Sequence, residues 1–285
     1  MNKKKLYIGW DIGGAHTKYT ISTDSKDTVE CRIMICELWK SLSQLENIIK
    51  NVNVKYKKKF HIINIISMSA EMCDIFSSRK KGVKAILSLF ENKGFVNHIY
   101  SKDSGISKFQ SFKNYSSLAS TNWMAIPDYL KNMDKNIIAI DIGSTTTDIV
   151  LIKNHICINK RHDDYSGLNT KELLYTGALR TPMYSIINSL NLNKKIYNII
   201  PENFSTMSDV YRLLSIIKKK SDYTETADGR SKSTKDTLRR ISRVFGFDYS
   251  IDKKKTINML SRKIMSAHLD QISYTIKNHI KDNFS

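Results

Sequence analysis

Two similar stretches decide the fold of this chain: LYIGWDIGGAHTKYTI at residues 6–21 and NIIAIDIGSTTTDIVLI at residues 136–152. Each is a β-favouring run that ends in Asp-Ile-Gly, passes through a turn of small residues and continues into a second β-favouring run. That order predicts a β-hairpin. Because the pattern recurs 130 residues later, with Asp141 in the place of Asp11, we expect two similar subdomains, at residues 1–134 and 135–285.

The rest of the chain predicts an alternation of strands and helices, and therefore an α/β protein. In the first half we expect strands at 29–37, 61–67 and 96–100, and helices at 41–49, 83–92 and 119–133, the last one broken near Pro127. In the second half we expect a strand at 156–160 and helices at 168–175, 181–190, 209–218, 235–245 and 252–282.

The composition is that of a soluble globular protein, with 41% hydrophobic and 26% charged residues. No run approaches the roughly 20 apolar residues of a membrane-spanning helix. The apolar run at residues 6–10 is also shorter than the roughly 7–15 residues of a signal-peptide core, which favours the cytoplasm. Four cysteines without a C-x-x-C pair predict reduced thiols rather than a zinc site or disulfides.

The chain is strongly basic, with 46 Lys and Arg against 27 Asp and Glu, or a net charge of +19. Lysine runs occur in unrelated segments, so a solvated lysine-rich surface explains the charge best. Nucleic acid is the weaker interpretation, because aromatic residues are not interleaved with these runs.

The chemistry of the two hairpin turns points to phosphate. Glycine lets the backbone approach an anion closely, and successive turn N–H groups form a concavity that binds phosphate. An aspartate at the strand end then has a role as a ligand of Mg²⁺ that bridges to the phosphate oxygens. The predicted phosphate-binding residues of the turns are Gly13, Gly14, Thr17, Gly143, Ser144, Thr145 and Thr146. The predicted metal ligands are Asp11, Asp141 and Asp148, with Lys18 as a neutralising cation.

These turns resemble the phosphate loops of the actin/sugar-kinase/Hsp70 superfamily. More narrowly, the chain is similar to the hydantoinase/oxoprolinase-like family linked to methanofuran and tetrahydromethanopterin one-carbon metabolism. Five blocks carry this resemblance: GWDIGGAHTK at 9–18, MSAEM at 68–72, YTGALRTP at 175–182, DVYRLL at 209–214 and TADGR at 226–230. The resemblance implies an actin-like ATPase (ribonuclease H-like) fold, with two duplicated subdomains and a cleft between them.

The sequence departs from the superfamily at one point. A third glycine-rich turn usually binds adenosine, but here the last glycine is Gly246. Either the end of the second subdomain is absent or the chain is a short variant. Phosphate binding survives this omission, and the use of ATP stays open.

The resemblance implies an enzyme of methanofuran-type cofactor synthesis. Such a transferase joins a furanylmethyl diphosphate to the phenol of a glutamyl-tyramine and releases diphosphate. One alternative is an ATP-dependent hydantoinase/oxoprolinase-like hydrolase or small-molecule kinase of the same superfamily. A second alternative is a regulator that responds to nucleotide without catalysis.

The remaining site residues follow from that reaction. Arg180 and Arg230 are predicted to bind the diphosphate or a substrate carboxylate, whereas Arg212 is divided between that role and a salt bridge. Glu71 and His16 are the candidates to accept the phenolic proton. The run His162-Asp163-Asp164 is predicted to form a solvated turn rather than a metal site.

Overall fold

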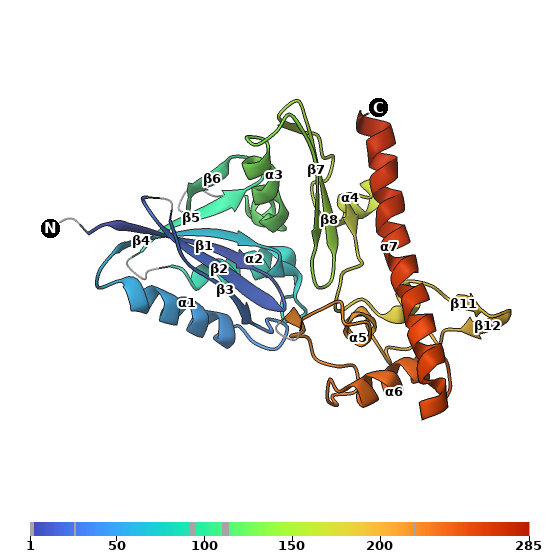
Figure 1. The fold of residues 1–285 in the computed structure, drawn as a ribbon. Coiled ribbons are helices and arrows are strands. Elements are labelled where there is room, and N and C mark those ends of the chain that lie inside the picture. Colours follow the sequence, from blue (N-terminus) through green and yellow to red (C-terminus); the bar gives the residue numbers. More distant parts are fainter. Residues whose placement is uncertain (1–2, 26, 92–94, 110–113, 219–220, 285) are drawn as a thin grey trace. The chain divides into compact units, whose positions relative to one another are not determined.

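A computed structural model describes residues 3–25, 27–91, 95–109, 114–218 and 221–284. The chain forms two compact units, Met1–Asp134 and Lys135–Ser285, and Figure 1 shows their helices and strands. Each unit is described by itself below.

The first unit is built on a six-stranded sheet in the order β3-β2-β1-β4-β5-β6. The strands are β1 (Lys5–Ile12), β2 (His16–Thr23), β3 (Thr28–Ile35), β4 (His61–Met68), β5 (Val96–Ser101) and β6 (Gly105–Lys108). Strands β1, β2 and β3 pair antiparallel, whereas β4 is parallel to β1 and β5 is parallel to β4. This arrangement places the carboxyl ends of β1 and β4 at the same edge of the sheet.

Helices make the crossovers that parallel strands require. They are α1 (Ser43–Tyr56), before β4, and α2 (Arg79–Ser88), between β4 and β5; the short α3 (Ala125–Leu130) follows β6. Strand β1 alternates strictly, so that Leu6, Ile8, Trp10 and Ile12 are at most 2% exposed. The apolar faces of α1 and α2 join these side chains in one core. The core therefore fixes the strand that delivers Asp11 to the sheet edge.

The second unit repeats the hairpin, but the strands and helices that follow it differ from those of the first unit. Its strands are β7 (Asn136–Ile142), β8 (Thr147–Lys153), β9 (Ile156–Cys157), β10 (Leu173–Leu174), β11 (Ser189–Leu192) and β12 (Lys195–Asn198). Its helices are α4 (Asp164–Thr170), α5 (Met207–Leu213), α6 (Thr234–Val244) and α7 (Lys254–Phe284). Every strand pair here is antiparallel among the described residues, so the parallel strands expected from a full duplication are not found there. The core forms where α5, α6 and α7 pack together.

Three predicted helices differ from the structure. A helix was predicted at 168–175, but helix α4 ends at Thr170 and Leu173–Leu174 form strand β10. Residues 181–190 contain only a single 3-10 turn, Met183–Ser185, and the start of β11. The helix predicted at 119–133 is reduced to a 3-10 turn, Asn122–Met124, followed by α3. Strand β6 and the β11–β12 hairpin were not predicted.

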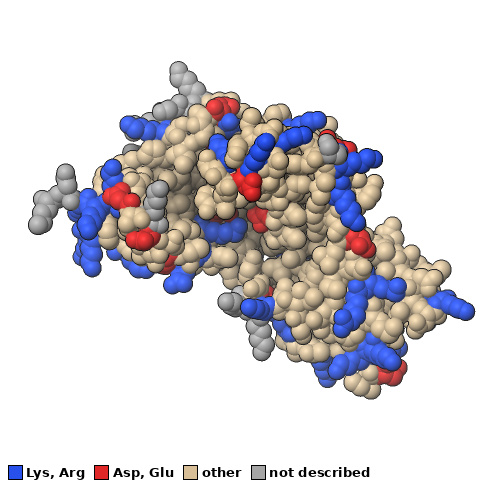
Figure 2. All heavy atoms as spheres, turned by 45° about the horizontal axis from the view of Figure 1, so that its top comes forward, with Lys and Arg blue, Asp and Glu red and all other residues tan. Residues whose placement is uncertain are grey.

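Three further observations concern the surface, the helices and the cysteines. In the face shown in Figure 2, Lys and Arg lie in separate groups rather than in one continuous stripe. Within the described residues, no helix is both long and apolar enough to cross a membrane. All four cysteines are described, and none of them is in a disulfide.

Candidate functional site

The turn between β1 and β2, which we call loop 1, is a tight two-residue turn. The N–H of Gly13 donates to the carbonyl of His16 at 3.0 Å, which leaves Gly14 and Ala15 at the tip. A Cβ on Gly13 would lie 2.9 Å from that carbonyl oxygen, so a side chain does not fit there. The N–H of Gly13 is therefore used within the turn, and the anion-binding donors that loop 1 can offer are those of its tip.

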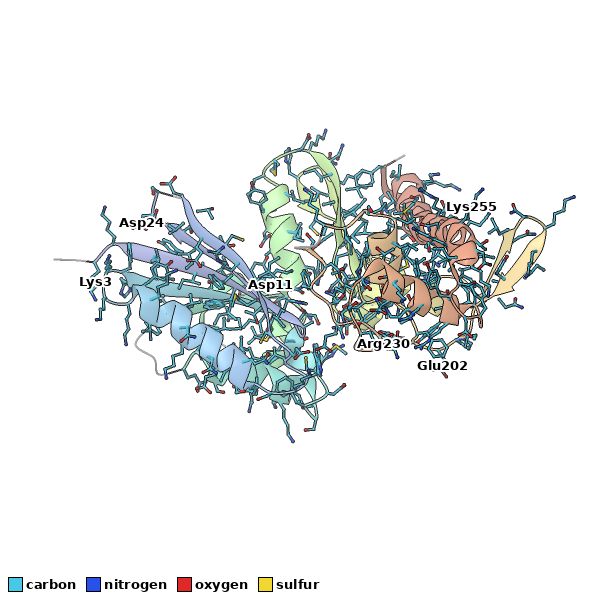
Figure 3. The ribbon with its side chains drawn as sticks, turned by 60° about the horizontal axis from the view of Figure 1, so that its bottom comes forward. Lys3, Asp11, Asp24, Glu202, Arg230 and Lys255 are labelled. Carbon is cyan, nitrogen blue, oxygen red and sulfur yellow. The ribbon has the colours of Figure 1, made fainter. Side chains whose placement is uncertain are left out.

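Asp11 and Lys18 face each other across the strands that lead into loop 1. Lys18 Nζ donates to Asp11 Oδ2 at 2.9 Å, and the lysine side chain is 52% exposed. The other oxygen, Asp11 Oδ1, is buried and has no hydrogen-bond partner in the described part of the chain. Figure 3 labels Asp11 at its place in the fold. One carboxylate oxygen is thus neutralised, and the other is left for a cation or water.

Thr17 lies on the inward face of β2. Side chains on a strand alternate between faces, and β2 turns Thr17 inward while Lys18 faces outward. Thr17 is 0% exposed, so its hydroxyl lies below the surface. A contact between this hydroxyl and phosphate stays a prediction.

Glu71 lies three residues past β4, in the 3-10 turn Ala70–Met72. Its carboxylate is fully buried, and Oε1 accepts hydrogen bonds from both N–H and Oγ of Ser120, each at 2.9 Å. Ser120 has a φ of 50°, a left-handed conformation that costs energy in a residue other than glycine. Helix α2 packs so closely here that a Cβ on Gly82 would lie 2.3 Å from the Glu71 carbonyl oxygen. Glu71 therefore holds a strained segment in place beside the end of β4.

The turn between β7 and β8, which we call loop 2, has the same closure as loop 1. The N–H of Gly143 donates to the carbonyl of Thr146 at 2.8 Å, and Ser144 and Thr145 form the tip. The register is also the same, because Asp141 lies opposite Asp148 just as Asp11 lies opposite Lys18. The two predicted phosphate loops are therefore local copies of one backbone design.

Loop 2 is braced by the segment 176–180, which belongs to the YTGALRTP block. Its N–H groups donate to the loop: Ala178 to the Gly143 carbonyl at 2.9 Å, and Leu179 and Arg180 to the Ser144 carbonyl at 3.1 and 2.8 Å. A Cβ on Gly177 would lie 2.6 Å from the Thr145 nitrogen and 2.7 Å from the Gly143 oxygen. Only glycine permits this approach, and it fixes the exposed Arg180 beside the loop.

Asp148 forms an ion pair with Arg161, which was not predicted as a site residue. Arg161 contacts Asp148 through Nη1, and its Nη2 donates to Asp164 at 3.2 Å. Burial raises the pKa of Asp148, and the Arg161 guanidinium opposes that shift. The negative charge of Asp148 is therefore paired with Arg161 inside the second unit. The exposed Asp141 is the better-placed carboxylate for a metal at loop 2.

His162-Asp163-Asp164 also has a structural role. Asp163 is the N-cap of α4, where its side chain accepts from the N–H of Ser166 at 2.8 Å in a capping box. Glu172 accepts the N–H groups of Lys160 and Arg161 at 2.8 and 2.7 Å, and so fixes the approach to this helix.

The two remaining arginine predictions separate clearly. Arg212 binds Asp209 and Asp222 in a buried network, so the salt-bridge role is the one that the structure shows. The fully buried Arg240 of α6 completes the network, with Nη2 2.8 Å from Asp209. Arg230 is instead exposed, in a turn where Thr226 Oγ1 donates to its carbonyl at 2.7 Å (Figure 3). Arg230 is therefore not one of the residues that form the buried network around Arg212.

Of the two buried arginines that were not predicted, Arg240 could have been recognised in the sequence and Arg161 could not. Arg240 lies on α6 between Leu238 and Ile241, where a charge on an apolar stripe indicates a buried partner. Nothing in the sequence links Arg161 to Asp148, because the contact depends on how the chain returns after β9.

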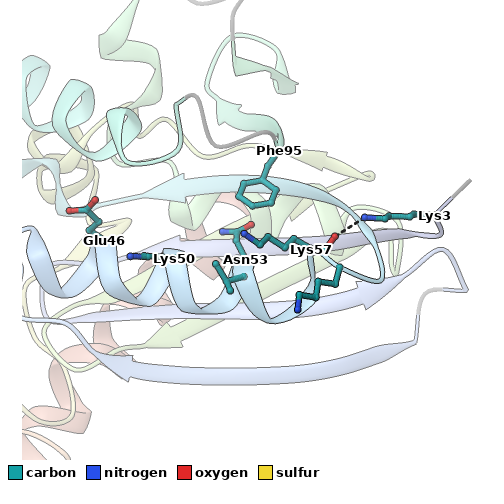
Figure 4. Close-up of a pocket in the computed structure, with 8 residues that line it drawn as sticks. Lys3, Glu46, Lys50, Asn53, Lys57 and Phe95 are labelled. Atoms are coloured by element: carbon teal, nitrogen blue, oxygen red, sulfur yellow. Dashed lines mark hydrogen bonds between the residues drawn. The ribbon is translucent and has the colours of Figure 1, made fainter.

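A basic groove of about 660 Å³ lies beside the start of β1, at the opposite end of the strand from Asp11. Its residues include Lys3, Lys50, Lys57 and Phe95, and Lys3 Nζ donates to the Lys57 carbonyl at 2.9 Å (Figure 4). The length of β1 separates this groove from loop 1, so it is not part of the candidate site.

Comparison with known proteins gives consistent results. The model of the hydantoinase/oxoprolinase family matches residues 63–283. A curated protein of Methanocaldococcus jannaschii is 30% identical over 274 residues, which cover 94% of this chain and 80% of that protein. It is named (4-{4-[2-(gamma-L-glutamylamino)ethyl]phenoxymethyl}furan-2-yl)methanamine synthase. A protein of the same name from Methanococcus vannielii is 35% identical over 131 residues, covering 45% of this chain and 58% of that protein.

Among solved structures, nucleotide-free acetone carboxylase aligns with 100% of this chain and 64% of its own, at 10% sequence identity and a TM-score of 0.55. At this identity the likeness concerns the fold alone. Together with the β3-β2-β1-β4-β5 sheet and the repeated hairpin, it identifies the actin-like ATPase fold. Because the family model spans most of the sequence and a curated relative aligns over 94% of it, the chain belongs to the hydantoinase/oxoprolinase family.

Proposed function

We propose that this protein is a synthase of methanofuran-type cofactor biosynthesis, and that it forms the ether bond between a phenol and a furanylmethyl group. The observation that carries the proposal is the relationship to two proteins named as synthases of a phenoxymethyl-furan product. The paired hairpin loops support it, because they supply anion-binding turns for a phosphate-bearing substrate.

The proposed reaction uses a furanylmethyl diphosphate and the phenol of a γ-glutamyl-tyramine. The bond between the furanylmethyl carbon and the diphosphate oxygen breaks, and its electron pair leaves with diphosphate. The phenol oxygen forms the new C–O bond and releases its proton to a base. Because the furan ring oxygen donates electron density to the reacting carbon, departure of the leaving group sets much of the barrier. The catalytic demand therefore falls on groups that stabilise charge on the diphosphate.

This chain offers two kinds of groups for that charge. The turn N–H groups at the tips of loops 1 and 2 can donate to phosphate oxygens. Lys18 and Arg180 add positive charge beside loops 1 and 2, respectively. Exposed Arg230 is proposed as a third contact to the diphosphate or a substrate carboxylate.

The residues present also fit Mg²⁺. Asp11 Oδ1 is a buried carboxylate oxygen without a partner among the described residues, and Asp141 is an exposed carboxylate at the equivalent position. No cluster of three or more His, Cys, Asp or Glu in the described residues could hold a metal alone. Mg²⁺ can bind a single carboxylate, such as Asp11 or Asp141, and take its other ligands from water and phosphate. When bound, the ion would neutralise charge developing on the diphosphate.

Glu71 and His16 remain the two proposed acceptors of the phenolic proton, and their surroundings differ. Glu71 is fully buried and holds Ser120, so its loss would alter stability as well as rate. His16 is partly exposed at the start of β2, beside loop 1, so a substrate can reach its side chain. Melting temperature and turnover, measured together, separate the two roles.

The test is diphosphate release from a furanylmethyl diphosphate, with and without γ-glutamyl-tyramine, followed by mass spectrometry of the ether. We expect release to require both substrates and Mg²⁺, and Asp11→Asn and Asp141→Asn to weaken Mg²⁺-dependent diphosphate binding. The matched control is Asp103→Asn, an exposed aspartate in the β5–β6 turn. Turnover that depends on ATP and releases ADP, without ether formation, would overturn the proposal in favour of a hydrolase or kinase. Tight nucleotide binding without any turnover would favour a regulator.

A further inference from the structure

The second unit contains a groove of about 660 Å³ between helix α7 and the segment 170–176. We call it the α7 groove and define it by Lys171, Tyr175, Thr176, Gln271, Tyr274 and Asp282, which line it. We propose that the α7 groove binds the acceptor substrate, a phenol that carries a zwitterionic amino-acid group. This inference rests on the proposed function, because the acceptor is the phenolic half of that reaction.

The aromatic character of the groove suits a phenol ring. Tyr175 and Tyr274 both line it, and they are 56% and 69% exposed. Large aromatic side chains gain free energy when they are covered, and stacked aromatic pairs contribute further. Two exposed tyrosines that line the same groove therefore offer aromatic surface to a flat aromatic ligand.

Thr176 adds an unused hydrogen-bonding group. It lines the groove and is 7% exposed, and its hydroxyl has no hydrogen-bond partner within the described residues. A buried polar group without a partner costs free energy, so a ligand that supplies one would be favoured. A phenol oxygen or an amide of the acceptor can supply it.

Charge in the groove matches a zwitterion. Lys171 and Asp282 both line it, and no ion pair between them is found in the described structure. Lys171 has a φ of 59°, and its carbonyl accepts a hydrogen bond from His279 Nε2 at 3.0 Å. The backbone that carries the lysine is thus held by α7 itself. A γ-glutamyl group carries one carboxylate and one ammonium, which complement the lysine and the aspartate.

The groove is joined to loop 2 by a direct contact. Thr147 follows Thr146, the residue that closes loop 2. The hydroxyl of Thr147 donates to the Thr176 carbonyl at 2.6 Å. The next residue along the chain, Gly177, packs against loop 2. One short segment therefore has the α7 groove on one side and a predicted phosphate loop on the other, as an enzyme that joins a phenol to a diphosphate-activated carbon requires.

Binding of γ-glutamyl-tyramine to the full-length protein, measured by calorimetric titration, tests the inference. We expect Tyr274→Ala to weaken binding by about tenfold, in line with the loss of an aromatic contact. Tyr129→Ala should leave it unchanged, since Tyr129 is also 69% exposed but lies on α3. We expect Lys171→Asn, which tolerates the left-handed backbone, to weaken γ-glutamyl-tyramine but not tyramine, which lacks the carboxylate. Diphosphate affinity should not change in either groove variant.

The outcomes separate the two proposals. If the ether forms and Tyr274→Ala binds the acceptor as tightly as the natural protein, the α7 groove is not the acceptor site and the proposed function stands. If the acceptor binds with the expected pattern but no ether forms, the groove assignment stands and the reaction is wrong. Equal losses of γ-glutamyl-tyramine and tyramine in Lys171→Asn would overturn the assignment of the carboxylate to Lys171.

Discussion

Substitution of Gly177 by alanine should disrupt loop 2 although it replaces no charged side chain. The added Cβ would lie 2.6 Å from the Thr145 nitrogen and 2.7 Å from both the Gly143 oxygen and the Ser144 carbonyl carbon. All three are backbone atoms, so the clash is relieved only if the segment 176–180 moves away from the loop. That movement would break the three hydrogen bonds by which this segment donates to loop 2.

The structure gives the size of the effect. A typical intramolecular hydrogen bond contributes about 0.5–1.5 kcal/mol, so the loss of three corresponds to about 1.5–4.5 kcal/mol. For a domain of about 150–250 residues, each kcal/mol lowers the melting temperature by about 2–4 °C. We therefore expect a decrease of about 3–18 °C in thermal unfolding, together with weaker binding of diphosphate.

Gly9→Ala is the matched control, because a Cβ there meets its nearest neighbour, the Thr20 carbonyl oxygen, at 3.9 Å. It should unfold at close to the natural temperature. If Gly177→Ala melts at the same temperature as the control and binds diphosphate normally, the bracing of loop 2 by this segment has no energetic importance.

Three further predictions concern acidic side chains. Glu71→Gln should lower the melting temperature, because an amide replaces the buried carboxyl group that accepts both bonds from Ser120; if Glu71 is the base, turnover also falls by about 10²–10⁴, and a normal rate would exclude that role. Asp209→Ala should destabilise the protein by about 3–5 kcal/mol in chemical denaturation, since it leaves two buried arginines without this counter-charge; a change under 1 kcal/mol on the same scale would contradict this. A hydrogen bond from Lys55 leads the contacts that lower the pKa of Glu30 from 4.5 to about 2. Because that folded-state pKa is depressed, its stabilisation is complete above pH 4.5 and disappears as the pH falls toward 2. Glu30→Gln should therefore flatten the acid side of the stability profile, and an unchanged profile would show that Glu30 does not contribute.

The hairpins could be predicted because all of their determinants are local. A β-favouring run, an Asp-Ile-Gly end and a turn of small residues act within about fifteen positions. Strands β4 and β5 could also be predicted, β4 because its nearly continuous apolar run is typical of a buried strand. The positions of Asp11 and Asp141 at strand ends follow from these same patterns.

The errors lie where distant contacts override local preference. Residues 168–175 favour a helix, but Lys171 has a φ of 59° and Leu173 pairs with Asp148 of β8. The β11–β12 turn uses Asn193 and Lys194, both with positive φ, where Asn-Gly would have been the recognisable signal. The α7 groove could not be predicted either, because its two walls are separated by about a hundred residues of sequence.

The two loops share a backbone but differ in charge at one equivalent position, and this difference separates their roles. Opposite Asp11 lies Lys18, which engages one carboxylate oxygen at 2.9 Å. Opposite Asp141 lies Asp148, a second carboxylate, which forms an ion pair with Arg161. A cation at loop 1 must therefore bind beside an ammonium group that already pairs with Asp11, whereas at loop 2 the guanidinium of Arg161 pairs with Asp148. Because like charges repel and opposite charges attract over these short distances, Asp141→Asn should cost more Mg²⁺ affinity than Asp11→Asn. We therefore propose that loop 1 contributes chiefly through Lys18, as a direct contact to the anion.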